Sequence, residues 1–276
     1  MALYAPARSV LRVAGEDADG FLDALVTADV SRATPEAPVY AGLLSPQGKV
    51  IADFIAFRGA DGSLLLDVDR GRAEDLMRRL TLYRLRRKIE IGDASDRFHV
   101  AIRTDAQSAL SADPRRADGS IGARMLETTA PANPDPTTDY AALLVAVGVP
   151  DLSVDAAPEE VFALEALLEE LNGVDFQKGC FIGQENVSRM KRRATTRRKF
   201  CRIAFEGPAP AFGTEIAAGP AQIGSVRSGI DGRAIALLRL DRAVEAAERN
   251  IALTAGDIPV RLDPPAWLIM PEPGDD

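Results

Sequence analysis

The stretch that decides the fold is residues 173–185, which read GVDFQKGCFIGQE. Two glycines bracket Cys180 at close range, and glycine permits tight backbone conformations and the close approach of a ligand. The stretch follows a turn and precedes residues 184–191, whose pattern predicts a helix. Cys180 then lies near a helix N-terminus with Lys178 two residues away, and both features favour the thiolate. The residues alone leave two interpretations open: a reactive or ligand-binding cysteine, or a small buried residue in a glycine-rich turn.

Residues that commonly hold metals are scarce in this chain. Its 276 residues include two cysteines, Cys180 and Cys201, and a single histidine, His99. A zinc or iron–sulfur site takes about four Cys or His ligands, so we expect no permanently bound metal in the monomer. We interpret His99 as structural, because it lies in an alternating strand, and Cys201 as a core residue of a later strand.

The composition also bears on location. Two cysteines are not a disulfide framework and fit a reducing compartment. Residues 1–8 show no basic segment followed by an apolar stretch, so no secretory signal is expected. No window approaches the ~18 continuous apolar residues of a membrane span. The sequence therefore predicts a cytoplasmic protein that does not contact membranes.

Hydrophobic periodicity predicts one α+β unit in the first third of the chain. Alternation indicates strands at 9–13, 63–68 and 88–91, and helical spacing indicates helices over 17–30 and 72–87. Apolar runs at 40–44 and 49–57 flank the sequence SPQG, which suits a type I turn, and together they predict a β-hairpin. This order of elements is typical of helices packed on a largely antiparallel sheet.

A second unit begins with an alternating strand at 98–102. Residues 128–138 contain three prolines and predict a loop. Residues 159–171 predict an amphipathic helix with an apolar stripe of one valine and four leucines, ended by Asn172-Gly173. From residue 200 onward, short strands separated by Gly, Pro and Asp predict a small antiparallel barrel or sandwich.

Residues 178–185 resemble the Lys-Gly-Cys-Tyr/Phe-x-Gly-Gln-Glu signature of the YgfZ group, which are folate-binding proteins related to the glycine-cleavage T-protein. Further segments agree with motifs of the same group. They are FLDALVTADV at 21–30, LLSPQGKV at 43–50, YRLR at 83–86 and GSVRS at 224–228. The resemblance therefore covers essentially the whole chain.

The resemblance implies an α+β, three-domain, T-protein-like ring around a central hole in which tetrahydrofolate binds. We expect two α+β domains with antiparallel sheets, a ferredoxin-like one over residues 1–95 and a middle one over 96–192. A C-terminal antiparallel β-barrel over 193–276 completes the expected ring.

The resemblance also implies a function. It indicates a tetrahydrofolate-binding accessory factor in the assembly or repair of iron–sulfur clusters, which supports iron–sulfur enzymes including tRNA-modifying ones. Lys178 and Cys180 match residues regarded as essential in the group and are the expected catalytic pair. The expected partners are folate and iron–sulfur proteins or their assembly machinery, and the chain is expected to be a monomer.

Five further residues are expected to contact the cofactor. Gln184, Glu185 and Arg189 shape the surroundings of Cys180. Asp53 in the hairpin and Glu165 are additional candidates for folate contacts, although a plain surface position is the alternative for Asp53. The group often has Asn two residues after the glutamate, where this chain has Leu.

The chain departs from the T-protein at two positions. It has Cys180 where the T-protein has Asp, and Ala52-Asp53 where the T-protein carries an Asp-Asp pair. We therefore expect no glycine-cleavage aminomethyltransferase activity. The alternative function is a folate-dependent aminomethyl or one-carbon transferase that acts on a small amine. Two roles of the Cys180 thiolate stay open: a transient iron ligand, or an acceptor of a folate-linked one-carbon unit.

The charge distribution is uneven. The net charge of −8 argues against general affinity for nucleic acids. Residues 189–199 nevertheless contain seven basic residues and no acid. Two interpretations of this basic run are open. It is expected to bind phosphates, a polyglutamate folate tail or an acidic partner, or to be a solvated linker. A tRNA site is expected to have aromatic residues interleaved with the basic ones, and this run has none. Direct nucleic-acid binding is therefore not expected.

Overall fold

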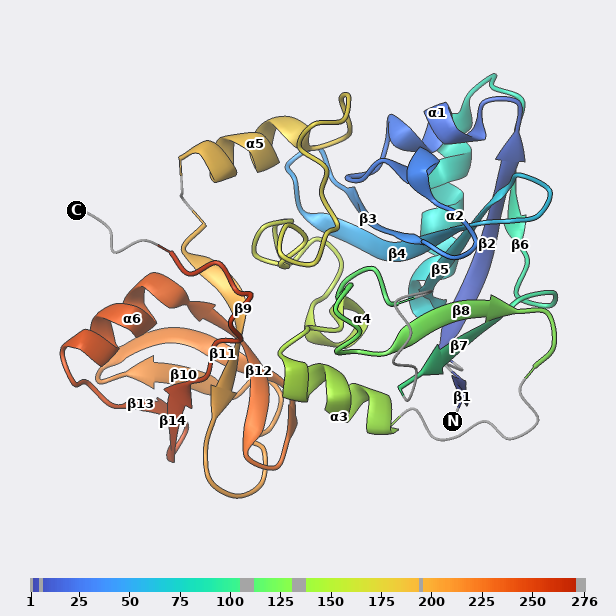
Figure 1. Ribbon diagram of the computed structural model, residues 1–276. Helices are drawn as coiled ribbons and strands as arrows, with labels where there is room; N and C mark the ends of the chain where they lie inside the picture. Colours follow the sequence, from blue (N-terminus) through green and yellow to red (C-terminus); the bar gives the residue numbers. More distant parts are fainter. Residues whose placement is uncertain (1, 5–6, 105–111, 131–137, 194–195, 272–276) are drawn as a thin grey trace.

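The computed structural model describes residues 2–4, 7–104, 112–130, 138–193 and 196–271 (Figure 1). The first sheet is antiparallel, has five strands and follows the order β3-β4-β5-β2-β6. Its strands are β2 (Arg8–Gly15), β3 (Val39–Leu44), β4 (Val50–Arg58), β5 (Leu64–Asp69) and β6 (Ile89–Asp93). All the strands predicted here, and the hairpin, are confirmed.

Helices cover one face of this sheet, as Figure 1 shows. They are α1 (Ala18–Asp23), the 3-10 helix η1 (Val30–Arg32) and α2 (Arg70–Arg84). The helix predicted over 17–30 is therefore shorter than expected. In β4, Ala52, Phe54 and Ala56 pack toward the helices, whereas Ile55 and Phe57 join the core on the opposite face. Burial on both faces explains why β4 is nearly continuously apolar.

The second sheet is also antiparallel and has the order β1-β7-β8. It consists of β1 (Ala2–Tyr4), β7 (His99–Arg103) and β8 (Ala123–Glu127), followed by the helices α3 (Thr138–Val147) and α4 (Leu152–Asp155). Because β1 pairs with β7, the first residues of the chain contribute to this sheet rather than to the first one. Most of the loop predicted over 128–138 lies outside the described residues.

The prediction of a helix over residues 159–171 is wrong, because this segment forms a succession of turns. Its backbone bonds to the hairpin instead: Glu159 N donates to the Val50 carbonyl at 2.7 Å, and Val50 N donates to the Val161 carbonyl at 2.9 Å. Leu167 adopts a left-handed φ of 61°, which interrupts any helix. The apolar stripe is buried as expected, but pairing with β4 overrides the local helical periodicity.

The C-terminal part of the chain forms a closed antiparallel barrel with the strand order β10-β11-β12-β9-β14-β13. Its strands are β9 (Arg198–Ala204), β10 (Glu215–Ala218), β11 (Ala221–Ile230), β12 (Arg233–Arg239), β13 (Leu253–Ala255) and β14 (Ile258–Leu262). The predicted barrel is confirmed. Strand β10 and the helix α6 (Leu240–Glu248), which packs on the barrel, were not predicted.

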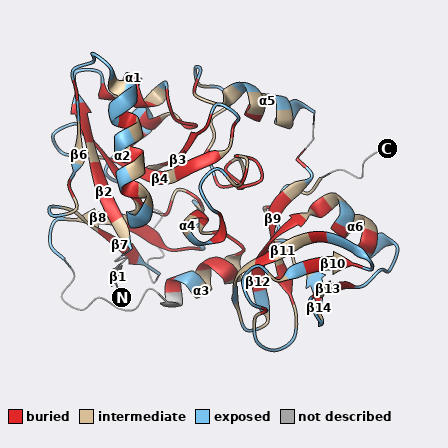
Figure 2. Cartoon of the chain, turned by 180° about the vertical axis from the view of Figure 1, so that it is seen from behind, coloured by how far each residue is buried: buried red, intermediate tan, exposed pale blue. Residues whose placement is uncertain are grey.

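One hydrophobic core joins these units. It runs from Ile55 and Phe57 of the first sheet through Leu144 of α3 to Phe200 and Ile235 of the barrel. Figure 2 shows these strands buried and much of α5 (Gln184–Arg192), which leads to the barrel, exposed. The continuous core fixes the positions of the loops between the units.

Asp155 joins α4 to the barrel. Its fully buried carboxylate accepts hydrogen bonds from the backbone N–H groups of Asp151 and Ser228, both at 2.8 Å. Burial raises the pKa of Asp155 to about 6, because the charged form is poorly solvated there. A carboxyl group whose pKa rises on folding contributes stability that is complete below its unfolded pKa of 3.8. That contribution is lost as the pH rises through about 6.

We therefore expect Asp155→Asn, which stays neutral, to gain stability relative to wild type as the pH rises. The relative gain in unfolding free energy is about 2–3 kcal/mol between about pH 4 and about pH 7.5. Urea titrations of both proteins across this range measure it. A difference that stays constant with pH would contradict the raised pKa.

Candidate functional site

The loop before α5, residues 173–183, is anchored at its start to the buried Thr27. The Thr27 hydroxyl donates to the Gly173 carbonyl at 2.5 Å and accepts from Gly42 N at 2.8 Å. Asp175 N donates to the Thr27 carbonyl at 2.9 Å. A Cβ at Gly173 would lie 2.8 Å from Tyr40 and from Leu168. Only glycine therefore lets this loop approach β3 so closely.

Lys178 is buried beneath the same loop. Its side chain is 3% exposed, and its ammonium forms an ion pair with Asp23 Oδ1 at 2.8 Å. The ammonium also donates to three carbonyls at and just after the end of α1: Asp23 at 2.6 Å, Val26 at 2.8 Å and Ala28 at 3.2 Å. Carbonyls at a helix C-terminus lack partners within the helix, and a lysine satisfies them well.

This geometry gives Lys178 a structural role, and its expected catalytic role stays a prediction. An ammonium group has three hydrogens, and three carbonyls accept them here. In this arrangement Lys178 holds the loop against α1.

Cys180 lies on the outside of this loop. It is exposed and has a free thiol, whereas its neighbour Phe181 is buried. Gly183, with a left-handed φ of 81°, is the N-cap of α5, so Cys180 lies close to the start of that helix as predicted. The interpretation of Cys180 as a small buried residue is therefore wrong, and an accessible thiol remains.

Cys201 differs from Cys180 in its burial. It lies on β9, is buried and is also a free thiol. Burial raises the pKa of Cys201 to about 12, so it stays protonated at neutral pH. Its predicted place in the core is confirmed.

The first turn of α5 rests on the hairpin turn. A Cβ at Gly183 would lie 2.7 Å from the Ser45 carbonyl, and the Asn186 amide donates to the Gln47 carbonyl at 2.6 Å. A shallow groove of about 330 Å³ lies here. It is lined by Pro46, Gln47, Phe162, Glu185, Asn186 and Arg189. The structure thus brings Glu185 and Arg189 together, and the Gln184 amide lies 3.5 Å from the Gly179 carbonyl.

Asp53 faces a separate cavity of about 200 Å³. The Tyr40 hydroxyl donates to Asp53 Oδ2 at 3.0 Å. Burial raises the pKa of Asp53, and the nearby charge of Arg8 partly opposes this shift. Asp53 is therefore a cavity residue rather than a surface residue. Ala52 packs on the other face of the sheet, so an acid at position 52 would point into the apolar core.

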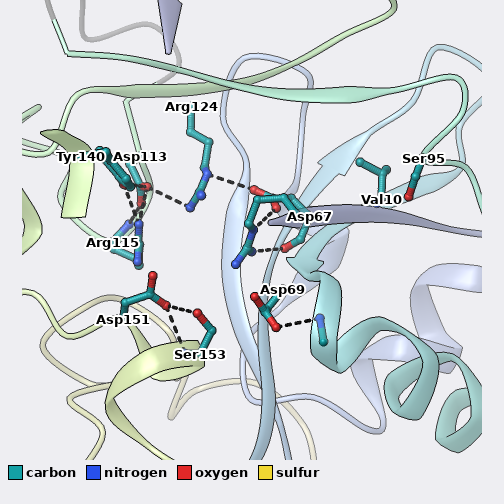
Figure 3. A network of polar contacts seen from close by, with 12 residues as sticks. Val10, Asp67, Asp69, Ser95, Asp113, Arg115, Arg124, Tyr140, Asp151 and Ser153 are labelled. Carbon is teal, nitrogen blue, oxygen red and sulfur yellow. Dashed lines mark hydrogen bonds and ion pairs between the residues drawn. The ribbon is translucent and has the colours of Figure 1, made fainter. Parts of the chain in front are cut away.

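A buried network of charges lies beside the same cavity (Figure 3). Asp67 pairs with Arg8 at 2.6 Å and with Arg124 at 3.0 Å. Asp113 pairs with Arg115 at 2.8 Å. Although burial opposes ionisation, Arg115 lowers the pKa of Asp113 to about 2.

No pattern in the sequence predicts this network of charges. Its members come from β2, β5, β8 and the segment before β8, and they follow no motif or spacing. Arg8, Arg115 and Arg124 line the cavity together with three aspartates, so its wall carries both signs of charge. The arrangement favours a ligand that offers N–H donors to Asp53 and an acceptor or negative group to the guanidinium groups.

Glu165 does not face either cavity. Both carboxylate oxygens bond to the Arg198 guanidinium, at 2.9 and 3.0 Å, and one also accepts from Phe162 N. The structure therefore shows a structural role for Glu165, and its expected contact with a cofactor stays a prediction. Its carboxylate is fully engaged in joining the central segment to the barrel.

The basic run divides into two parts. Lys191, Arg198 and Lys199 form ion pairs with the acids Glu169, Glu165 and Glu170, respectively. Arg192, Arg193 and Arg197 are exposed. Part of the run thus stabilises the fold, and part remains available to a partner.

No group of three or more His, Cys, Asp or Glu side chains in the part of the chain that the structure describes could hold a metal ion. Within the same residues, no helix is long and apolar enough to cross a membrane.

The C-terminal barrel matches a family model. Residues 197–269 match the model of the C-terminal β-barrel domain of CAF17. This match agrees with the closed barrel seen in the structure.

Three curated relatives carry the name iron–sulfur cluster assembly factor IBA57, mitochondrial, or its homolog. The mouse (Mus musculus) protein is 31% identical, over 84% of this chain and 75% of its own length. The human (Homo sapiens) protein is 29% identical, over 91% of this chain and 83% of its own length. The Mycosarcoma maydis protein is 32% identical over 72% of this chain, which spans only 56% of that relative.

A solved structure shares the fold. The glycine cleavage system aminomethyltransferase T from Bartonella henselae superposes with a TM-score of 0.73 at 14% identity. The match covers 97% of this chain and 86% of that one. The predicted fold class, a T-protein-like α+β arrangement with a C-terminal barrel, is confirmed.

The expected cytoplasmic location is wrong. All three of these relatives are named as mitochondrial proteins. Few cysteines and no apolar span are features of proteins from any reducing compartment, so the composition could not separate one such compartment from another.

Proposed function

The chain belongs to the IBA57 family of iron–sulfur cluster assembly factors, and from this premise we propose that it is a tetrahydrofolate-binding accessory factor in the assembly or repair of iron–sulfur clusters. The proposal includes the clusters of tRNA-modifying enzymes and a relationship to the YgfZ group. The family membership supports the assembly role. The folate-binding role is supported by the shape and chemistry of the Asp53 cavity.

The observation that carries the proposal is the presentation of Cys180. Its thiol is exposed at the start of α5, and the loop beneath it is held at Lys178, Phe181 and Gly173. A thiolate is a strong nucleophile and a good iron ligand. A loop fixed at both sides of such a thiol presents it in one place to a docking protein.

A cluster on Cys180 would be cargo shared with another protein. An iron–sulfur cluster takes about four thiolate ligands. Cys201 is buried in the barrel, and the described residues contain no group of ligands near Cys180 that could complete the set. We infer that the chain acts as a monomer that contributes one thiolate, while the iron–sulfur protein or its assembly machinery contributes the others.

The Asp53 cavity suits part of a tetrahydrofolate molecule. Asp53 Oδ2 accepts from Tyr40, and its carboxylate lines the cavity. The pterin ring presents a ring N–H and an amino group side by side, which is the donor pair that a carboxylate accepts. At about 200 Å³ the cavity is below the roughly 300–1,000 Å³ of pockets that enclose whole ligands. We therefore place only the ring there.

Three residues of this cavity would contribute to binding. Asp53 would accept the ring N–H groups, Tyr40 would hold Asp53 in orientation, and the guanidinium of Arg115 would attract a ring acceptor. When bound, tetrahydrofolate supplies a carrier for one-carbon units.

Asp53→Asn is expected to weaken tetrahydrofolate binding by about 10- to 100-fold, because hydrogen bonds to a charged group contribute about 1.5–3 kcal/mol. Calorimetric titration of the full chain under anaerobic conditions measures this. Glu248→Gln, an exposed acid on the barrel helix, is the matched control and should bind like wild type. The folate part of the proposal fails if wild type does not bind tetrahydrofolate at all.

A further inference from the structure

The segment at the end of α2 exposes apolar side chains together. We call residues 82–88 the α2 turn. In it, Leu82 is 63% exposed, Tyr83 38% and Leu85 84%. The other large apolar side chains exposed in the described part of the chain are scattered: Val154, Phe212, Ile251 and Ile269. An exposed apolar group of this kind indicates an interaction site.

Leu85 also has an unfavourable backbone conformation. Its φ is 51° and its ψ is −116°, a region that residues with a side chain rarely adopt. No apolar contact offsets this strain, because the side chain lies in solvent. A strained backbone that displays an exposed leucine suggests that the leucine serves something outside the chain.

The α2 turn is positively charged. Residues 84–88 contain four basic residues and no acid, although the whole chain has a net charge of −8. Arg86 and Lys88 are exposed, and neither forms an ion pair with another described residue. Arg192 and Arg193 at the end of α5 are exposed too. The segments on both sides of Cys180 therefore favour an acidic partner.

A single short helix connects the α2 turn to Cys180. Arg87 pairs with Asp17 at the start of α1 at 3.5 Å, and Lys178 pairs with Asp23 at its end at 2.8 Å. A helix of six residues is about 9 Å long. Figure 1 shows the end of α2, α1 and the loop before α5 along the same side of the molecule. One partner can therefore contact both places.

We propose that the α2 turn is a docking surface for an acidic protein, which takes Leu85 in an apolar pocket and meets Cys180 beside it. This inference rests on the proposed function, since the partner is the iron–sulfur protein that Cys180 serves. A protein fits better than a membrane. Membrane-binding helices carry an apolar face along their length, whereas Leu76 and Leu80 of α2 are buried against the sheet.

Photo-crosslinking in cells tests the surface. The full chain carries benzoylphenylalanine in place of Leu85 or, as matched control, in place of Phe212, which is 57% exposed on the barrel. We expect at least fivefold more crosslinking at position 85, to an iron–sulfur protein, through a peptide rich in Asp and Glu. Adding Arg86→Glu and Lys88→Glu should reduce it at least tenfold. Equal crosslinking at both positions, insensitivity to charge reversal, or capture of lipid, nucleic acid or a second copy of this chain would overturn the proposal.

Leu85→Gly provides a second measurement on the purified captured protein. Glycine accepts a positive φ, so the melting temperature of the variant should not fall. Its affinity for the partner should fall about tenfold or more, as for a residue at the centre of an interface. Unchanged affinity would overturn the proposal.

The two proposals fail separately. If docking is wrong, the position-85 crosslink is absent while Cys180→Ala still lowers iron–sulfur enzyme activity. If the proposed function is wrong, Cys180→Ala leaves that activity intact while the crosslink remains.

Discussion

Replacing Cys180 with alanine is expected to lower the activity of iron–sulfur enzymes at least tenfold in cells that depend on this chain, without unfolding the protein. The thiol is exposed, so its removal should change the unfolding free energy by about 0.5 kcal/mol or less. The chemistry is lost because no other accessible thiol is present in the described residues. Enzyme assays in cell extracts, normalised to an enzyme without iron, measure the loss. The melting temperature of the purified variant measures its folding.

Cys201→Ala is the matched control. It removes a buried sulfur from the barrel and should cost about 1–2 kcal/mol of unfolding free energy through the small cavity it leaves. Its activity per folded molecule should stay at the wild-type level. Wild-type activity in Cys180→Ala would remove the proposed mechanism, and equal losses in both variants would indicate a folding defect instead.

Lys178→Met is expected to lower the unfolding free energy by about 2–4 kcal/mol, because a buried ion pair and charged hydrogen bonds are lost together. Methionine retains the apolar stem, but the three carbonyls at and after the end of α1 and the Asp23 carboxylate lose their cation. The loop over residues 179–183 should then exchange its amide hydrogens faster. Activity should fall as well, because Cys180 is no longer held in one place.

The rate of Cys180 alkylation by iodoacetamide separates holding from chemistry. The rate is measured as a function of pH in wild type and in Lys178→Met. If Lys178 only holds the loop, the two curves of rate against pH should have the same shape. Lys191→Met is the control, since Lys191 pairs with Glu169 near the surface, and its loss should cost less than about 1 kcal/mol. A variant of Lys178 that keeps its stability and loop protection but loses activity would indicate a direct chemical role.

The β3–β4 hairpin links the two parts of the candidate site. Its turn, residues 45–48, contacts Gly183 at the start of α5. Its strand β4 places Asp53 in the cavity. Because both strands lie in a sheet buried on both faces, the hairpin is rigid and sets the position of the Cys180 loop relative to the cavity.

The strands and the barrel could be predicted because their signals are local. Alternation marks β2, β5 and β7, and the turn around Pro46 and Gly48 marks the hairpin. The failed helix over 159–171 shows the limit of this approach. A buried apolar stripe at helical spacing also suits a chain of turns, and the bonds that decide between them come from β4, more than 100 residues earlier.

By itself, the sequence determined the class of fold and the barrel, because both depend on neighbouring residues and short motifs. The functional role of the segment around Cys180 stays a prediction. Only the tertiary structure decided what the individual side chains do. Lys178 lies two residues from Cys180, yet its ammonium points to carbonyls about 150 residues earlier in the chain. Glu165 bonds to the barrel, and Asp53 reaches a cavity. A buried charge takes whichever partner the packed chain brings within hydrogen-bond distance, and spacing along the sequence carries no record of that choice.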